Sequence, residues 1–121
     1  MLGKNKKIGK WGEELAKEFF VRAGYKLIVG NWTRRIGEID LILKKNNEIV
    51  FVEVKTRSTP FCGWAEDAVT PTKKKKISLL IDRYLLEEEG FKDCFPRFDI
   101  LVVELISLTP KFIHYENVFL N

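Results

Sequence analysis

The chain has 121 residues, of which 45% are hydrophobic and 31% are charged, and its formal net charge is +4. This length and composition predict a single domain over residues 1–121 and exclude a disordered chain. No apolar run approaches the roughly 20 residues of a membrane-spanning helix, and the basic N-terminus lacks the apolar stretch of a secretory signal. We therefore expect a cytoplasmic protein that has no membrane partner.

The expected elements, in chain order, are a helix over residues 8–23, strands over residues 25–32, 37–44 and 48–55, a helix from residues 70–72 to just before Gly90, and strands over residues 98–106 and 111–115. Helical and alternating apolar spacings support these assignments. In residues 37–44 the alternation places Ile39, Leu41 and Leu43 on one face. Residues 57–69 are expected to form a long loop. The order predicts an α/β fold in which helices flank a mixed sheet.

Cysteine and histidine are too sparse for several common catalytic chemistries. Cys62 and Cys94 lie far apart in the sequence, and His114 is the only histidine. This pattern excludes a zinc finger and a Cys–His nucleophilic pair. Catalysis, if present, must therefore use carboxylates, lysines, arginines and a bound metal, while the positive net charge favours a polyanionic partner.

A predicted two-residue turn at residues 46–47 would bring two carboxylates together. In that register the numbers of facing residues sum to 93, so Asp40 faces Glu53. Like charges in such positions destabilise a hairpin unless a cation lies between them or one carboxyl keeps its proton. Mg²⁺ suits such a pair, and Lys55 projects to the same face as Glu53. A slip of one residue would separate the two acids.

Each of these acidic residues also has an ordinary explanation. Asp40 and Glu53 could belong to a solvated polar face, and a Glu-x-Lys sequence is common by chance. Glu13 borders the apolar stripe of the first helix, where Gly9 and Gly12 would permit close approach of a strand or a phosphate backbone. Glu13 could instead only stabilise the first helical turn.

Three segments together resemble the PD-(D/E)XK, or restriction-endonuclease-like, superfamily. They are Gly-x-x-Gly-Glu at residues 9–13, Gly-Glu-Ile-Asp-Leu-Ile at residues 37–42 and Phe-Val-Glu-Val-Lys-Thr-Arg at residues 51–57. The chain is most similar to the bacterial YraN-like family, which is related to the archaeal Holliday junction resolvases, and residues 97–100 match a later strand of that family. The resemblance covers nearly the whole chain and implies an α-β-β-β-α-β core.

The resemblance also implies roles for individual residues. Asp40 and Glu53, with the main-chain carbonyl of Val54, would bind Mg²⁺ or Mn²⁺. Lys55 would be the catalytic lysine. Glu13 would act on the metal directly or through a water molecule. The sequence departs from the motif's name because an isoleucine precedes Asp40 in place of proline, a substitution common enough in the superfamily to leave the metal assignment in place.

Basic and aromatic residues form a candidate DNA-binding set: Lys7, Arg34, Arg35, Arg57, Trp64, Lys73, Lys74, Lys75 and Lys76. Lys7 is the nearest counterpart of a basic residue in the resolvases. The run at residues 73–76 opposes the dipole of its helix, which a bound phosphate would relieve, although a solvated charged face is an equal alternative. Trp64 could stack on an unpaired base or cover the core. Asp99 is expected to pair with Arg34, Arg35 or Arg57, and His114 to be structural.

The sequence thus predicts a metal-dependent DNA endonuclease, with branched or otherwise structured DNA as a candidate substrate. One alternative is a nucleic-acid-binding module of the same fold with little or no cleavage activity. Another is a structural or interaction protein whose acidic cluster is incidental. A homodimer is a further expectation, because cutting two strands of a junction requires two sites.

Overall fold

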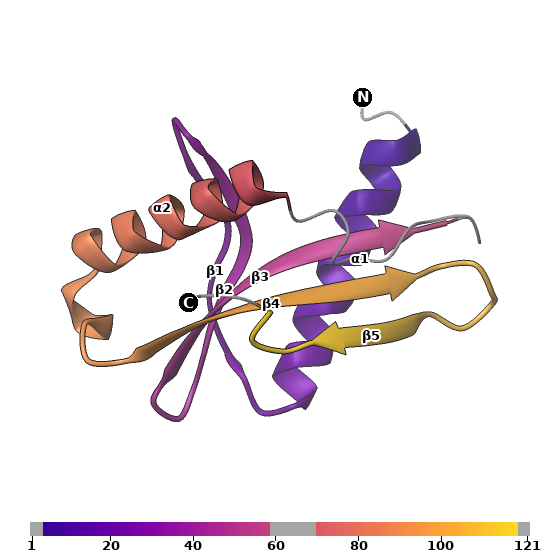
Figure 1. Ribbon diagram of the computed structural model, residues 1–121. Coiled ribbons are helices and arrows are strands. Elements are labelled where there is room, and N and C mark those ends of the chain that lie inside the picture. Colours follow the sequence, from indigo (N-terminus) through magenta and orange to yellow (C-terminus); the bar gives the residue numbers. More distant parts are fainter. Residues whose placement is uncertain (1–3, 59–69, 119–121) are drawn as a thin grey trace.

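The computed structural model describes residues 4–58 and 70–118 (Figure 1). In chain order the elements are α1 (Lys4–Arg22), β1 (Lys26–Arg34), β2 (Gly37–Lys45), β3 (Glu48–Arg57), α2 (Pro71–Glu87), the short 3-10 helix η2 (Glu89–Phe91), β4 (Phe95–Glu104) and β5 (Lys111–Tyr115). The predicted order of helices and strands is confirmed. The bounds differ by a few residues: α1 begins four residues earlier than expected, and β4 spans residues 95–104 in place of 98–106. Most of the expected long loop, and Trp64 within it, lie outside the described residues.

The five strands form one mixed sheet in the order β1-β2-β3-β4-β5. Strands β3 and β4 are parallel, and every other neighbouring pair is antiparallel. The parallel pair arises because α2 carries the chain back between β3 and β4, whereas short turns join the antiparallel neighbours. The predicted α/β fold, with a mixed sheet flanked by helices, is therefore confirmed.

The two helices cover opposite faces of the sheet and create two cores. Along β3, Val50 and Val52 pack with residues of α1, which runs behind the strands in Figure 1. Ile49 and Phe51 point to the other face and pack with residues of α2. We call these the α1-side core and the α2-side core. The near-continuous apolar sequence of β4 follows from the same arrangement, because both of its faces are buried.

The hairpin of β2 and β3 has the predicted register. Lys45 pairs with Glu48 around the turn, where Asn46 has a φ of 53°, and the pairing continues to Leu41 and Val52. All of these pairs have numbers that sum to 93. The paired residues end there, one position before Asp40 and Glu53, so the two acids lie where the strands stop bonding to each other.

The alternation predicted for β2 is wrong at Ile39. Leu41 and Leu43 belong to the α1-side core, but Ile39 joins Ile42 in the α2-side core. Residues three apart cannot share a face of a regular strand, because side chains alternate with a period of two. Regular alternation therefore breaks between Ile39 and Leu41, at Asp40, where pairing with β3 has ended and β2 can turn toward α2.

A buried ionic network on β4 corrects the expectation for Asp99. Asp99 is completely buried, and both of its oxygens accept hydrogen bonds from Arg97, at 2.9 and 2.8 Å. His114 Nε2 lies 2.7 Å from the same carboxylate, and the backbone N–H of Asn117 donates at 2.9 Å. Asp99 therefore pairs with its neighbour on β4 rather than with Arg34, Arg35 or Arg57. Arg97 reaches Asp99 because residues two apart on a strand share a face.

No helix within residues 4–58 and 70–118 is long and apolar enough to cross a membrane.

Candidate active site

Asp40 lies at the point where β2 and β3 separate. Its Oδ2 accepts a hydrogen bond of 2.8 Å from the backbone N–H of Val54, which gives this donor on β3 a side-chain partner. Burial raises the pKa of Asp40 to about 6, against the opposing effect of that hydrogen bond, and the nearby charges of Glu13, Glu53 and Glu38 raise it further. Three other acidic side chains are thus close enough to act on Asp40.

Glu53 has one oxygen paired with two lysines and one with no partner. Its Oε1 lies 2.6 Å from the Nζ of Lys73 on α2 and 3.4 Å from the Nζ of Lys55 on β3. Its Oε2 is buried, and within the described residues it is the one buried side-chain polar atom without a hydrogen-bond partner. A buried carboxylate oxygen without a donor is costly and indicates a missing partner, such as an ion.

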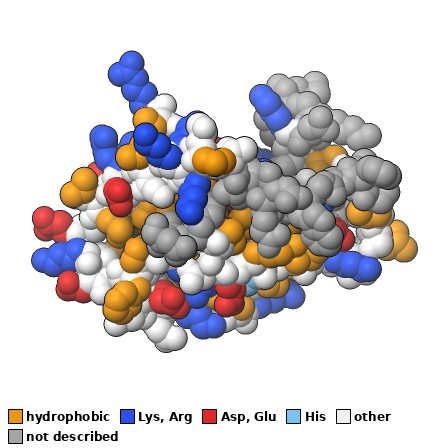
Figure 2. All heavy atoms as spheres, viewed as in Figure 1, with side chains coloured by type: hydrophobic (Ala, Val, Ile, Leu, Met, Phe, Trp, Pro, Cys, Tyr) orange, Lys and Arg blue, Asp and Glu red, His pale blue; other side chains and the backbone are white. Residues whose placement is uncertain are grey.

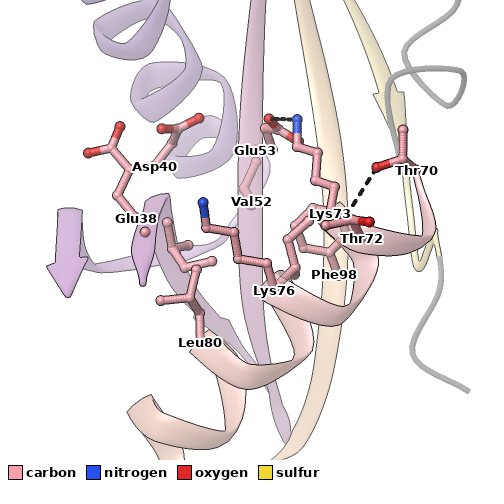
Figure 3. A pocket seen from close by; sticks show the side chains of 13 residues that line it. Glu38, Asp40, Val52, Glu53, Thr70, Thr72, Lys73, Lys76, Leu80 and Phe98 are labelled. Atoms are coloured by element: carbon pink, nitrogen blue, oxygen red, sulfur yellow. Dashed lines mark hydrogen bonds and ion pairs between the residues drawn. The ribbon is translucent and has the colours of Figure 1, made fainter. Parts of the chain in front are cut away.

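A cleft of about 380 Å³ opens beside these residues, between the ends of β2 and β3 and the first turns of α2. Asp40, Glu38 and Glu53 line it from the strands, while Lys73 and Lys76 line it from the helix (Figure 3). Figure 3 shows both lysine side chains extending from α2 toward the acidic side chains. Acids and amines therefore face each other across the cleft.

Glu13 approaches Asp40 from the other side. A second hollow, of about 280 Å³, is lined by Glu13 and Gly9 of α1 together with Asp40, Val54 and Thr56 of the sheet. Asp40 borders both hollows and so lies between Glu13 and Glu53. The helix-borne acid of the sequence analysis therefore does face the sheet.

Gly12 explains how α1 comes this close to β3. A Cβ atom on Gly12 would overlap the side chain of Thr56, whereas a Cβ on Gly9 would meet nothing within 4 Å. From the sequence we expect both glycines to permit close approach of a strand or a phosphate backbone. Gly12 is used for contact with a strand, and Gly9 leaves open space next to Glu13.

The first turn of α2 is fixed by its cap, which sets the position of Lys73. The Thr70 side chain accepts a hydrogen bond of 3.1 Å from the backbone N–H of Lys73, and Pro71 occupies the start of the helix. A Thr cap followed by proline favours helix initiation at this point. Lys73 therefore reaches Glu53 from the beginning of a well-defined helix.

The remaining members of the DNA-binding set are spread around this region. Arg34 stacks on Trp32 and forms a two-pronged ion pair with Glu87 at the far end of α2, and it does not line the cleft. Arg57 ends β3, two residues beyond Lys55. The side chains of Lys7 and Arg35 are exposed. Figure 2, in the view of Figure 1, shows Lys and Arg side chains on the surface of the molecule, with exposed hydrophobic side chains between them.

The acidic residues fit a divalent ion held by few protein ligands. Within residues 4–58 and 70–118, no group of three His, Cys, Asp or Glu side chains could hold a metal together. Mg²⁺ is often bound through one or two carboxylates, with water and substrate phosphate supplying the other oxygens. Asp40 and Glu53, one with a raised pKa and one with an unpartnered oxygen, match this requirement.

The model of the uncharacterised protein family UPF0102 matches residues 12–103 of the chain. A UPF0102 protein from Alkaliphilus oremlandii is 43% identical over 116 residues, which are 95% of this chain and 99% of the relative. Others, from Syntrophomonas wolfei and Flavobacterium psychrophilum, are each 38% identical, over 95% and 93% of this chain and 99% and 92% of their own lengths. The resemblance to the YraN-like proteins is thereby confirmed, and the chain belongs to family UPF0102.

Proposed function

We propose that the protein is a metal-dependent endonuclease that hydrolyses phosphodiester bonds in DNA, and that branched or otherwise structured DNA is its substrate. The buried, unpartnered Oε2 of Glu53, next to a carboxyl group with a pKa of about 6, is the observation that carries the proposal. A buried carboxylate oxygen without a hydrogen-bond donor costs free energy, so a partner that arrives with the reaction is the simplest account.

Asp40 and Glu53 would hold Mg²⁺ or Mn²⁺, and the main-chain carbonyl of Val54 would complete the protein ligands. Such an ion supplies a Lewis acid at the phosphate and lowers the pKa of water. Glu13 faces Asp40 across the second hollow, where it can orient a water molecule. These acidic residues come from three separate elements and supply the negative charge that binds a divalent ion.

Lys55 would bring a positive charge to the reacting phosphate. Its Nζ is 3.4 Å from Glu53, so it stays next to the acidic residues that hold the ion. A fixed ammonium in this position can hold the attacking water or offset the negative charge that develops on the phosphate oxygens. Arg57, farther along β3, would contact the DNA backbone together with Lys7, Arg35 and the lysines of α2. A DNA substrate would place this activity in the cytoplasm.

The experiment uses purified full-length protein with Mg²⁺ or Mn²⁺ and labelled linear, flapped and four-way DNA. We expect cleavage that requires the ion and is fastest on the branched substrates. Asp40→Asn and Glu53→Gln should abolish it, and Lys55→Ala should slow it about 10²- to 10³-fold, the usual effect of removing one charge-stabilising group. Glu18→Gln and Lys111→Ala, which change charge outside the cleft, serve as matched controls.

Three other results would contradict the proposal in different ways. Cleavage that persists in Asp40→Asn and Glu53→Gln would come from a contaminating nuclease. Binding to DNA without cleavage under any ion would support a nucleic-acid-binding module of the same fold. A protein that binds neither DNA nor RNA at low salt would have a structural or interaction role.

A further inference from the structure

We propose that Lys73 is a built-in competitor for the divalent ion: it holds Glu53 while the ion is absent and is released toward DNA phosphate when the ion binds. The inference rests on the proposed function, since it requires an ion at Asp40 and Glu53. It assigns to one lysine of α2 a positioning role that couples ion binding to substrate binding.

The contact itself distinguishes Lys73 from the other lysines around the cleft. Its Nζ is 2.6 Å from Glu53 Oε1, closer than the 3.4 Å of Lys55, although Lys55 is only two residues from Glu53 in the sequence. Both side chains are partly buried, with 31% of Lys73 and 20% of Glu53 exposed. Figure 3 shows Lys73 crossing from α2 to β3 to make this contact.

The ammonium of Lys73 satisfies only half of the carboxylate. It pairs with Oε1, while Oε2 of the same group is buried without a partner. A single positive charge therefore leaves the site acidic, and Asp40 and its acidic neighbours add to the negative charge. A cation of higher charge has a stronger attraction to this cluster than Lys73 has.

An ion at Glu53 and Lys73 in its present position would share one carboxylate and repel each other. An ammonium only 2.6 Å from a ligand oxygen would repel a divalent ion bound to the same carboxylate. In the proposal, this repulsion releases Lys73 from Glu53 when the ion binds. Its new surroundings are the start of α2, near Lys76, where a phosphate would meet backbone N–H groups and amines. Binding of the ion thus increases the number of amines available to DNA.

Manganese affinity tests the competition directly. We would titrate the full-length protein with Mn²⁺, without DNA, and follow the free ion by electron paramagnetic resonance. Lys73→Gln should bind Mn²⁺ about tenfold more tightly than wild type, within the usual range of coupling between two sites. Lys73→Arg keeps the charge and can hold both carboxylate oxygens, so it should not bind Mn²⁺ more tightly than wild type.

Two matched variants separate competition from a general change in charge. Arg83→Gln removes one positive charge from the same helix at an exposed position whose ion-pair partner is Glu87, and it should leave Mn²⁺ affinity unchanged. Lys76→Gln removes a charge from the same cleft and keeps the ion pair between Lys73 and Glu53. It should raise Mn²⁺ affinity less than Lys73→Gln does; an equal rise in both would overturn competition for Glu53.

The second half of the inference predicts coupling to DNA. With Ca²⁺ as the ion, the affinity of wild type for four-way DNA should rise at least about fivefold, and Lys73→Gln should lose most of this increase. An equal increase in both proteins would overturn the release of Lys73 to phosphate. Because both readouts are equilibrium affinities, neither depends on cleavage.

The outcomes also distinguish this inference from the proposed function. If wild type binds Mn²⁺ and Asp40→Asn does not, but Lys73→Gln binds no more tightly than wild type, the metal site stands and the competition is overturned. If neither wild type nor Lys73→Gln binds Mn²⁺, the metal site and the inference are both overturned.

Discussion

Asp99, which is buried, and Asp40, which is partly buried, have opposite electrostatic surroundings. Burial would raise the pKa of Asp99, but hydrogen bonds from His114, Arg97 and the Asn117 backbone bring it below its ordinary value. Asp40 has a single backbone donor and acidic neighbours, and its pKa is raised. A carboxylate whose oxygens all have hydrogen-bond partners stabilises the fold. A carboxylate with few donors and a raised pKa is typical of functional sites.

The raised pKa of Asp40 predicts a cost in stability that depends on pH. In the unfolded chain this carboxyl loses its proton near pH 4, and in the folded protein near pH 6. Its ionisation therefore destabilises the fold increasingly as pH rises from about 4 to 6, and fully above 6. We expect Asp40→Asn to raise the free energy of unfolding by about 2 to 3 kcal/mol at pH 8 and by little at pH 4.

Denaturant unfolding in the presence of a chelator, at pH 4 and pH 8, measures this difference. Asp93→Asn makes the same change in charge at an exposed position and serves as the control. A gain in Asp40→Asn that is equal at both pH values, or larger at pH 4, would contradict the assigned electrostatic cause.

At the scale of elements, the contact between α1 and β3 brings Glu13 to the sheet. Helix and strand meet at Gly12 and Thr56, and one turn of helix around that contact carries both Gly9 and Glu13. The two glycines have different surroundings, so the same substitution should have opposite effects at the two positions.

Gly12→Ala should lower the free energy of unfolding by about 1 to 3 kcal/mol, because the added methyl group overlaps Thr56 and pushes α1 away from β3. Gly9→Ala should raise it by about 0.5 to 1 kcal/mol, since alanine favours the helix and its methyl group meets no neighbour. Chemical denaturation of both variants measures the effects. Equal changes in the two would contradict the tight contact at Gly12.

The elements of this fold were largely predictable because their signals are local. Apolar spacing marks both helices, the Asn46–Asn47 turn fixes the register of β2 and β3, and Thr70 with Pro71 marks the start of α2. The position of Ile39 in the α2-side core could not be predicted from alternation, which places it with Leu41 and Leu43. It depends on the end of pairing at Leu41 and Val52, which is a property of the sheet and not of the strand.

At the scale of the whole molecule, the candidate site draws on the β2–β3 hairpin and on two helices, α1 and α2, that are separated from it in the chain. The acids of β2 and β3 could be brought together from the hairpin register alone, and Glu13 from its place on α1 and the family resemblance. The contact of Lys73 with Glu53 could not, because it depends on where α2 crosses the sheet. From the sequence, lysines at the start of this helix indicated an unfavourable dipole interaction that a bound phosphate would relieve, and no contact with Glu53.

Charges at both ends of α2 are compensated by ion pairs, two of which reach other elements of the fold. Lys73 near the N-terminus pairs with Glu53, and Glu87 near the C-terminus pairs with Arg34 and Arg83. The arginine pairs lower the pKa of Glu87 to about 2. Lys75 and Lys76 extend the positive charge of the N-terminal end and are exposed. The molecule therefore presents exposed amines next to the cleft.

This distribution predicts the salt dependence of DNA binding. Each lysine that contacts a phosphate contributes about 0.9 to the slope of log affinity against log salt concentration. The double variant Lys75→Gln, Lys76→Gln should therefore reduce the slope by about 2, measured by fluorescence anisotropy with labelled duplex at several salt concentrations.

The double variant Lys26→Gln, Lys92→Gln makes the same change in net charge, from +4 to +2 because two lysines are lost, at exposed positions on β1 and after η2. Long-range attraction would weaken equally in both proteins, since it depends on total charge. Direct phosphate contact would reduce the slope only in the α2 variant. Equal slopes in the two variants would therefore assign DNA binding to net charge and contradict a phosphate-binding surface at the start of α2.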